Sequence, residues 1–169
     1  MEGDMGAKEV DVKIIATEQV NDANGPATIL TYRIINEMQN EISVVDDGWI
    51  KWYQENKLIK LSLKREKMRK GVEAFGYFPP RLVKLLPRQH LEKKITLGWP
   101  VSLSRIWNEK DKASPAPGHY RLNIIIGYGI NDSIISEEDF DSIQEYEEKI
   151  FQWQKEATSN EVFIEIPPY

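Results

Sequence analysis

Apolar and polar residues alternate with a period of two along most of this chain, the pattern of strands that bury one face. The most regular example is residues 120–128, where every second residue from Tyr120 to Tyr128 is apolar, so we expect this segment at the centre of a sheet. Similar alternation or short apolar runs predict further strands at residues 10–16, 28–35, 42–45, 49–54, 58–64, 82–86, 91–97 and 161–166.

Turn-forming residues separate these segments. Asparagine, aspartate, glycine and proline at residues 21–26 predict a turn after the first strand, and residues 55–57 suit a hairpin between two paired strands. Residues 65–76 are basic and without a hydrophobic period, so we expect an exposed loop there. Residues 98–118 contain prolines and a polar run and predict a long connection.

One segment near the end has helical spacing. Ser136 with Asp139 three residues later resembles a capping box, and acidic residues fill the first turn, where the helix dipole favours them. The apolar stripe that follows is narrow, which predicts a helix at 136–158 lying against the domain with its acidic face in water. This helix belongs to an insertion at about 131–159, ahead of the last strand.

A series of strands with only one helix favours a mainly β fold, an antiparallel two-sheet sandwich, because parallel sheets need a helix between most strands. No internal repeat, low-complexity tract or linker divides the sequence. Residues 1–169 are therefore predicted to form a single β-sandwich domain, of a length that suits one hydrophobic core.

Several of these segments together resemble an immunoglobulin-like or fibronectin type III-like domain: the strand that ends at Asn36, residues 42–45, residues 91–97, residues 117–122 and residues 159–166. The resemblance implies that Tyr120, near the start of the penultimate strand, anchors the preceding corner through its hydroxyl. The chain departs from the pattern because it has no cysteine pair and carries a helical insertion where a short hairpin is usual. Such sandwiches serve many roles, so the resemblance implies no particular activity.

The amino-acid composition and the charge distribution limit the kinds of site that the chain can contain. The chain has no cysteine, which excludes a disulfide, a thiolate zinc site and a cysteine nucleophile. It shows neither a signal peptide nor a run of apolar residues long enough to span a membrane, so the simplest prediction is a cytoplasmic protein, or an extracytoplasmic one if a leader was removed. The net charge of −5 is uneven: residues 57–94 hold twelve basic and three acidic residues, and residues 136–157 hold eight acidic and two basic residues.

The sequence contains none of the usual catalytic and ligand-binding motifs. His90 and His119 have no carboxylate or second histidine at a metal-ligand spacing, and the serines at 102, 104 and 114 have no partner by spacing. Oxygen-rich turns at residues 21–24 and 46–47 leave calcium open, although aspartate and asparagine also cap turns without an ion. The sequence therefore predicts no catalytic, cofactor-binding or metal-binding residue and no cofactor.

Partners are predicted mainly from charge and aromatic content. The basic region beside Phe75, Tyr77 and Phe78 could meet nucleic acid, but lysines on strands more often keep a solvent face soluble, and the acidic helix could itself rest near this region. The aromatics at 49, 52, 53, 99 and 107 could form a sugar-binding platform, although core packing accounts for them better. The sequence thus favours a protein partner, leaves carbohydrate open and argues against nucleic acid.

These observations lead to one functional hypothesis and an alternative. The chain is predicted to be a binding or interaction module without catalytic function, and the alternative is a carbohydrate-binding or hydrolase accessory domain. Loops on a rigid sandwich usually carry recognition, so the partner surface is expected on the basic loop and on the inserted segment. Its predicted residues are Arg65, Lys67, Arg69, Lys70, Phe75, Tyr77, Glu137, Glu138, Asp141 and Glu145.

Overall fold

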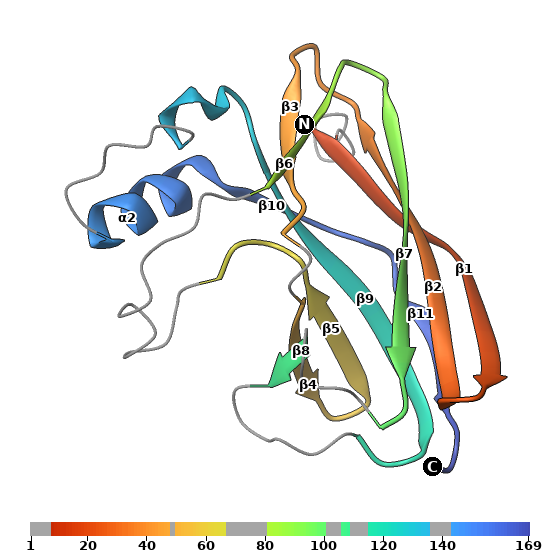
Figure 1. Cartoon of the computed structure of the whole chain (residues 1–169). Helices are drawn as coiled ribbons and strands as arrows, with labels where there is room; N and C mark the ends of the chain where they lie inside the picture. The colour runs from red at the N-terminus through yellow and green to blue at the C-terminus, as the bar shows by residue number, and fades with distance from the viewer. Residues whose placement is uncertain (1–7, 48–49, 67–80, 101–105, 109–114, 136–142) are drawn as a thin grey trace.

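Two β-sheets packed face to face, with one α-helix on the outside of the larger sheet, make up the structure in a computed structural model of the chain (Figure 1). The structure describes residues 8–47, 50–66, 81–100, 106–108, 115–135 and 143–169. In these residues the strands are β1 (Val10–Asp22), β2 (Gly25–Asn36), β3 (Ile42–Val45), β4 (Ile50–Glu55), β5 (Leu58–Ser62), β6 (Leu82–Leu85), β7 (His90–Gly98), β8 (Ile106–Asn108), β9 (Gly118–Gly129), β10 (Lys155–Thr158) and β11 (Val162–Ile166). The helical segments are the short 3-10 helix η2 (Asp132–Ile134) and the α-helix α2 (Ile143–Trp153).

The smaller sheet has the antiparallel order β1-β2-β7. Strands β1 and β2 form a long hairpin whose last paired residues are Asp22 and Gly25, as the turn residues at 21–26 predict. Gly25 has a φ of 106°, a backbone conformation that L side chains rarely adopt, so glycine suits this position. A bulge between Ile14 and Ala16 shifts the register of the hairpin.

The larger sheet is built around β9. Its main path of neighbours is β6-β3-β9-β5-β4-β8, in which β3 and β5 pair with different parts of the same edge of β9. Strands β10 and β11 pair successively with the opposite edge of β9. Most pairs are antiparallel, but β5 runs parallel to β9 and β8 runs parallel to β4. The prediction that residues 120–128 lie at the centre of a sheet is therefore confirmed, because strands pair with β9 on both sides.

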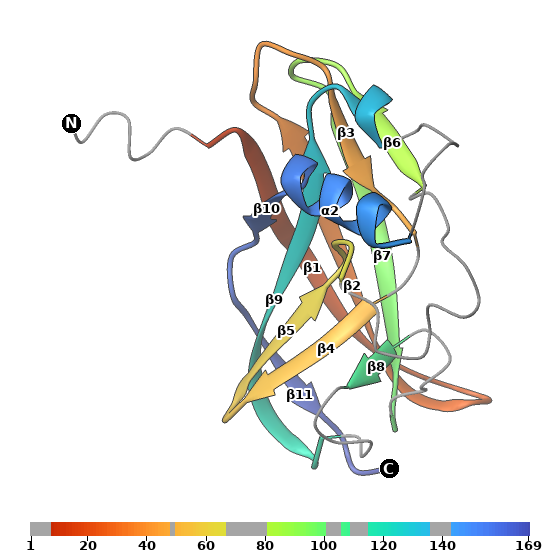
Figure 2. The same cartoon turned by 90° about the vertical axis from the view of Figure 1, so that its left-hand side faces the viewer.

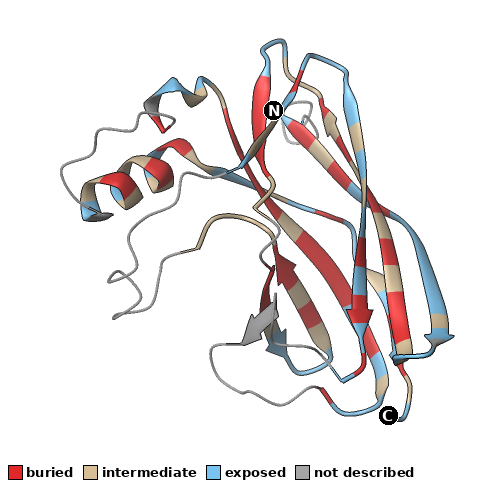
Figure 3. Cartoon of the chain, in the orientation of Figure 1, coloured by how far each residue is buried: buried red, intermediate tan, exposed pale blue. Residues whose placement is uncertain are grey.

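The main core lies between the two sheets, where Figure 3 shows the buried positions concentrated. Strand β9 contributes Leu122 and Ile124, which are 0% exposed, and β2 contributes Leu30 with the same value. On β1, β2, β7 and β9 alternate residues face this core, as the period of two predicts. The mainly β fold with two sheets, mostly antiparallel, agrees with the sequence.

Helix α2 packs on the outer face of the larger sheet, over β3 and β9 (Figure 2). It buries Tyr146, Ile150 and Trp153 against Val45 and Ile135, which forms a second, smaller hydrophobic cluster. The indole nitrogen of Trp153 also donates to the carbonyl of Ile130 over 2.8 Å. The smaller hydrophobic cluster thus attaches α2 to the larger sheet.

The predicted end of the helix is wrong. Residues 136–142 lie outside the described part, α2 ends at Trp153, and Lys155–Thr158 form strand β10 instead of a final helical turn. Lys155 pairs with Tyr128 and Thr158 with Ile125, so the backbone groups of this segment are bonded to β9. This long-range pairing outweighs a local helical preference, which is weak at the end of a helix.

Strand β8 is the other element that the sequence did not predict. It lies inside the segment 98–118, which was expected to be a connection without a strand. It has three residues and pairs in parallel with β4, from Ile50 opposite Ile106 to Trp52 opposite Asn108. Three residues are too few for a detectable alternation, so only the neighbouring strand defines this element.

The Tyr120 hydroxyl donates a hydrogen bond to the carbonyl of Ala116 over 2.7 Å, which is the corner contact that the resemblance implies. The bond holds the chain that enters β9 against the strand itself. The ammonium group of Lys57 lies 4.5 Å from the centre of the same ring. In the described part of the chain, no helix has the length and apolar character needed to cross a bilayer.

Candidate functional site

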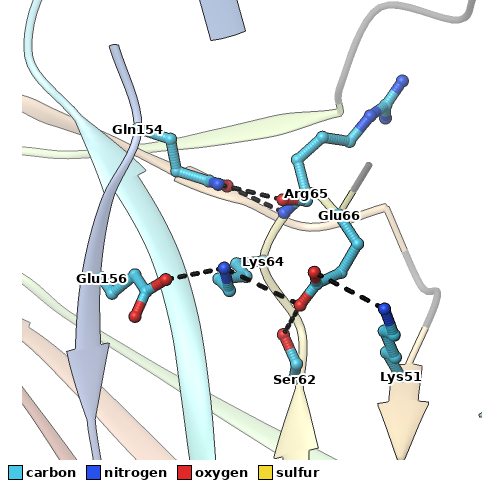
Figure 4. Close-up of polar contacts among 7 residues, drawn as sticks. All are labelled: Lys51, Ser62, Lys64, Arg65, Glu66, Gln154 and Glu156. Atoms are coloured by element: carbon cyan, nitrogen blue, oxygen red, sulfur yellow. Dashed lines mark hydrogen bonds and ion pairs between the residues drawn. The ribbon is translucent and has the colours of Figure 1, made fainter. Parts of the chain in front are cut away.

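The two segments predicted to carry the partner surface meet at one contact. Gln154 follows α2 directly and lies within the insertion at 131–159, and Arg65 begins the basic segment at 65–76. The backbone N–H of Arg65 donates to Oε1 of Gln154 over 2.8 Å, and Nε2 of Gln154 donates to the carbonyl of Arg65 over 3.0 Å (Figure 4). A single side chain thus satisfies both backbone groups of a residue 89 positions away.

Asp47 holds the two ends of the connection between β5 and β6. Its Oδ2 accepts from Nη1 of Arg65 over 2.7 Å, and its Oδ1 accepts from the backbone N–H of Arg81 over 2.8 Å. The N–H of the preceding Asp46 donates to the carbonyl of Arg81 over 2.7 Å. Arg65 and Arg81, which lie in the described chain on either side of residues 67–80, are therefore bonded to the same aspartate.

Gly127 makes the approach of these segments possible. A Cβ atom at this position of β9 would overlap the side-chain amide of Gln154 and would lie 2.9 Å from Cβ of Lys64. Any larger residue would push both side chains away from the sheet. Gly127 therefore lies where the segment after β5 and the residue after α2 pass close to β9.

A charged cluster on the outer face of the larger sheet, beside this contact, consists of Lys51, Ser62, Lys64, Glu66 and Glu156 (Figure 4). Nζ of Lys64 lies 2.6 Å from Oε1 of Glu156 and 3.8 Å from Oε1 of Glu66. Nζ of Lys51 lies 3.9 Å from Oε2 of Glu66, and the Ser62 hydroxyl donates to Oε1 of Glu66 over 2.8 Å. The cluster joins β4, β5, the segment after β5, and β10.

Partial burial and the neighbouring carboxylates have opposite effects on the pKa of Lys64. Burial is the largest single influence and lowers the pKa, but the hydrogen bond to Glu156 and the charges of Glu66 and Glu156 together raise it above its ordinary value. Lys64 therefore stays protonated at neutral pH. The pair Lys64–Glu156 also links the basic part of the sequence to the acidic insertion, which is the intramolecular pairing that the charge distribution leaves open.

The chemistry available to the cluster follows from its charge and its burial. Two ammonium groups face two carboxylates, so the charges compensate one another without an external ion. Ser62 is 1% exposed, and its hydroxyl donates its proton to Glu66 within the cluster. The cluster is suited to holding β4, β5 and β10 in fixed positions relative to one another, so that the segments next to them begin from a rigid base.

The structure describes only two of the residues predicted for the partner surface. Arg65 is half-buried, and Glu145 lies half-buried in the first turn of α2. The other eight lie outside the described residues: Lys67, Arg69, Lys70, Phe75, Tyr77, Glu137, Glu138 and Asp141. The assignment of these ten residues to a partner surface stays a prediction.

Other residues weighed for chemistry lie apart from one another. His90 begins β7 and His119 lies near the start of β9, and both side chains are exposed. Ser102, Ser104 and Ser114 lie outside the described residues. Within the described ranges, no group of three histidine, aspartate or glutamate side chains is arranged to hold a metal ion.

The aromatic residues weighed as a sugar platform divide between core and surface. Trp52 and Trp99 are each 3% exposed and meet edge to face with ring centres 6.2 Å apart, which confirms core packing for these two. Tyr53 faces outward, and the Lys51 ammonium lies 5.0 Å from the centre of its ring. Trp49 and the Trp107 side chain lie outside the described positions, so no continuous platform is formed by the aromatics that the structure places.

A second polar contact holds the start of β1 against β9 and β10. The Tyr128 hydroxyl donates to Oε2 of Glu9 over 2.6 Å, and Nζ of Lys155 lies 3.2 Å from the same oxygen. The hydrogen bond from Tyr128 is the main cause that lowers the pKa of Glu9, while slight burial opposes it and Lys155 adds to it. The pKa of Tyr128 is raised above its ordinary range. Burial is the largest cause, and the hydrogen bond to Glu9 and its negative charge add to the increase.

The residues that organise the site were missed by sequence reasoning, although signals for some of them exist. Lys51 and Ser62 alternate with the buried Trp52 and Leu61, so strand parity alone places them on the outer face. Gly127 interrupts a run of large apolar residues, which often marks a close approach. Nothing in the sequence pairs Gln154 with Arg65. Searches with this chain matched no family model, no curated protein and no solved structure.

Proposed function

We propose that this chain is a non-catalytic interaction module that binds a protein partner through the basic segment at 65–76 and the insertion at 131–159. The observation that carries the proposal is the contact between Gln154 and Arg65, which brings these segments to one side of the sandwich. Asp47 adds a fixed base for the basic segment. Recognition segments that extend from a rigid sandwich are a common means of binding proteins.

We further propose that the sandwich is immunoglobulin-like. In that fold the first, second and fifth strands share one sheet, and the third, sixth and seventh share the other. The order β1-β2-β7 in one sheet and the neighbours β3, β9 and β11 in the other support this assignment, as does the Tyr120 corner. The β4–β5 hairpin, β8 and the segment from η2 to β10 are additions to the plain pattern.

The basic segment supplies the charge for recognition. Lys67, Arg69 and Lys70 come within four positions, and the acidic insertion lies beside the point where their segment begins. A partner that presents acidic groups to the segment and basic groups to the insertion would match both. Such paired charges determine the orientation of the partner and increase its rate of association.

The test is a capture experiment with immobilised chain in native lysate, followed by identification of the retained protein. A variant with Lys67, Arg69 and Lys70 all changed to glutamate should lose at least about tenfold of the retained partner, because three attractive charges become repulsive. The matched control reverses Lys8, Arg88 and Arg121, exposed cations of the described surface that change the net charge equally. The control should retain the partner.

Two outcomes would contradict the proposal. Equal loss of the partner in both triple variants would show that only net charge matters. Full retention of the partner by the first variant would show that the basic segment is not part of the binding surface. Urea unfolding of each variant establishes beforehand that the sandwich is folded.

A further inference from the structure

The outer face of the smaller sheet is uncovered by the described part of the chain, in contrast to the larger sheet, which carries α2. Alternate residues of β2 point to this face, because Leu30, Tyr32 and Ile34 point into the core. The view in Figure 1 shows β1, β2 and β7 with no described helix or strand beyond them. The face is called the small-sheet face here and is defined by Lys13, Ile29, Arg33, Ile35, Glu92 and Lys94.

The small-sheet face carries apolar side chains on its central strand, and a further one lies beside it on β1. Ile29 and Ile35 lie on β2, the central strand, and both are half-buried by the strands at their sides. Ile15, at the bulge of β1, is 40% exposed, one of few large apolar side chains with that exposure among the described residues. A face on which apolar and charged side chains alternate along its central strand has both of the components of a protein–protein contact.

The charges on this face are arranged in a row but do not pair. Arg33 is the register partner of Lys13 on β1 and of Glu92 on β7, so the three side chains lie across the sheet at one level. Opposite charges at such cross-strand positions usually attract each other. No ion pair within 4.0 Å joins Arg33 to any described carboxylate, and its Nε is buried without a hydrogen-bond partner.

We propose that the small-sheet face packs against the same face of a second copy of this chain, with Arg33 of each copy paired to Glu92 of the other. A two-fold axis along the strands, midway between β2 and β7, places β2 of each copy over β7 of the other. Because Arg33 and Glu92 lie in the same row, the axis brings each arginine opposite the other copy's glutamate. Both pairs form together, as a two-fold interface requires.

The same axis covers the outward side chains of β2 and β7 and leaves β1 at the margin of the contact. Ile29 comes to lie over the register position of Thr96, and Ile35 over that of His90, so the half-buried isoleucines of both copies lose contact with water. Two sheets stacked in this way are about 10 Å apart, a distance that facing arginine and glutamate side chains can span. This proposal goes beyond the proposed function, because the smaller sheet lies on the opposite side of the sandwich from α2, the helix that Gln154 follows (Figure 1).

Sedimentation velocity over a range of concentrations tests the proposal. The wild-type chain should sediment with the mass of two copies, where one copy has 19.6 kDa. Arg33→Glu and Glu92→Arg, made singly, each place like charges opposite each other and should weaken the dimer by at least about tenfold. The double variant R33E/E92R restores opposite charges at both pairs and should return the dissociation constant to within about threefold of the wild-type value.

A control reverses Arg121, which pairs with Glu161 on the larger sheet, and should leave the dimer unchanged. A wild-type chain that stays monomeric at high concentration would overturn the proposal and leave the face to a different partner. Assemblies that grow beyond two copies would also overturn it, since a two-fold interface closes. Failure of the double variant to recover would exclude the Arg33–Glu92 pairing, and urea unfolding of all variants distinguishes this from loss of the fold.

Discussion

The side-chain amide of Gln154 bonds both backbone groups of Arg65, over 2.8 and 3.0 Å, and thereby joins the end of α2 to the segment that follows β5. An amide side chain can mimic a neighbouring strand in this way because it has one donor and one acceptor side by side. The two segments are separated by 89 positions in the sequence, so the contact contributes to tertiary structure and not to local structure.

Replacement of Gln154 by alanine should lower the free energy of unfolding by about 1–3 kcal/mol, because two partly buried hydrogen bonds are lost. The measurement is urea unfolding followed by tryptophan fluorescence. Gln152, an exposed residue of the last turn of α2, is the matched control, and its alanine variant should unfold within about 0.5 kcal/mol of the wild type. Equal stability of the Q154A and Q152A variants would show that the amide contact is not stabilising.

Gly129 should not tolerate a side chain. A Cβ atom there would overlap the indole ring of Trp153, so Gly129→Ala should displace α2 and lower the free energy of unfolding by about 1–3 kcal/mol. Gly98 is the control, because a Cβ atom at that position of β7 meets no other atom within 4 Å. Chemical denaturation of G129A and G98A compares the two, and a G129A variant as stable as G98A would mean that Trp153 moves aside without cost.

The corner bond of Tyr120 should be worth about 1 kcal/mol in the free energy of unfolding, as for a typical intramolecular hydrogen bond. Tyr120→Phe removes the bond to the Ala116 carbonyl but keeps the ring beneath the Lys57 ammonium. Tyr169→Phe also removes a hydroxyl that donates to a nearby carbonyl, that of Pro115, from a side chain that is 51% exposed. We expect the smaller effect for Y169F, and the reverse order in thermal unfolding would contradict a stabilising corner.

Alkaline pH should weaken the fold through Tyr32. Burial, together with the nearby charge of Asp46, raises the pKa of this hydroxyl above its ordinary value of 10.0. Its contribution to stability is therefore complete below pH 10 and is lost as the pH rises, because the unfolded chain ionises first. The loss is about 1.4 kcal/mol per pH unit while the folded tyrosine stays neutral.

Urea unfolding at several pH values between 8 and 11 measures this loss, and Tyr32→Phe should reduce the slope above pH 10. Tyr128 also has a raised pKa, so part of the slope remains in this variant. Phe163, which is 81% exposed and has no ionisable group, provides the control, and Phe163→Leu should keep the wild-type slope. An unchanged slope in Y32F would mean that Tyr32 ionises at the same pH in the folded and unfolded chains.

The sequence by itself determined the strands that alternate strictly and the turns between them. Period-two alternation located the core face of β9, because a buried sheet face selects apolar residues at every second position, and a short apolar run located β3 at Ile42–Val45. Asn56, with a φ of 54°, forms the hairpin turn that its residue type predicts. These are local properties, which neighbouring residues specify.

Only the tertiary structure decided where the helix ends, where β8 and β10 form, and which surfaces come together. Strand β10 exists because β9 offers unpaired backbone groups to Lys155–Thr158, and no local pattern reveals such an edge. The site depends on Gln154, Asp47 and Gly127, which meet Arg65, Arg81 and Lys64 from distant parts of the chain. Contacts between residues so far apart arise from the packing of whole elements, whereas hydrophobic periodicity specifies only which face of each element is buried.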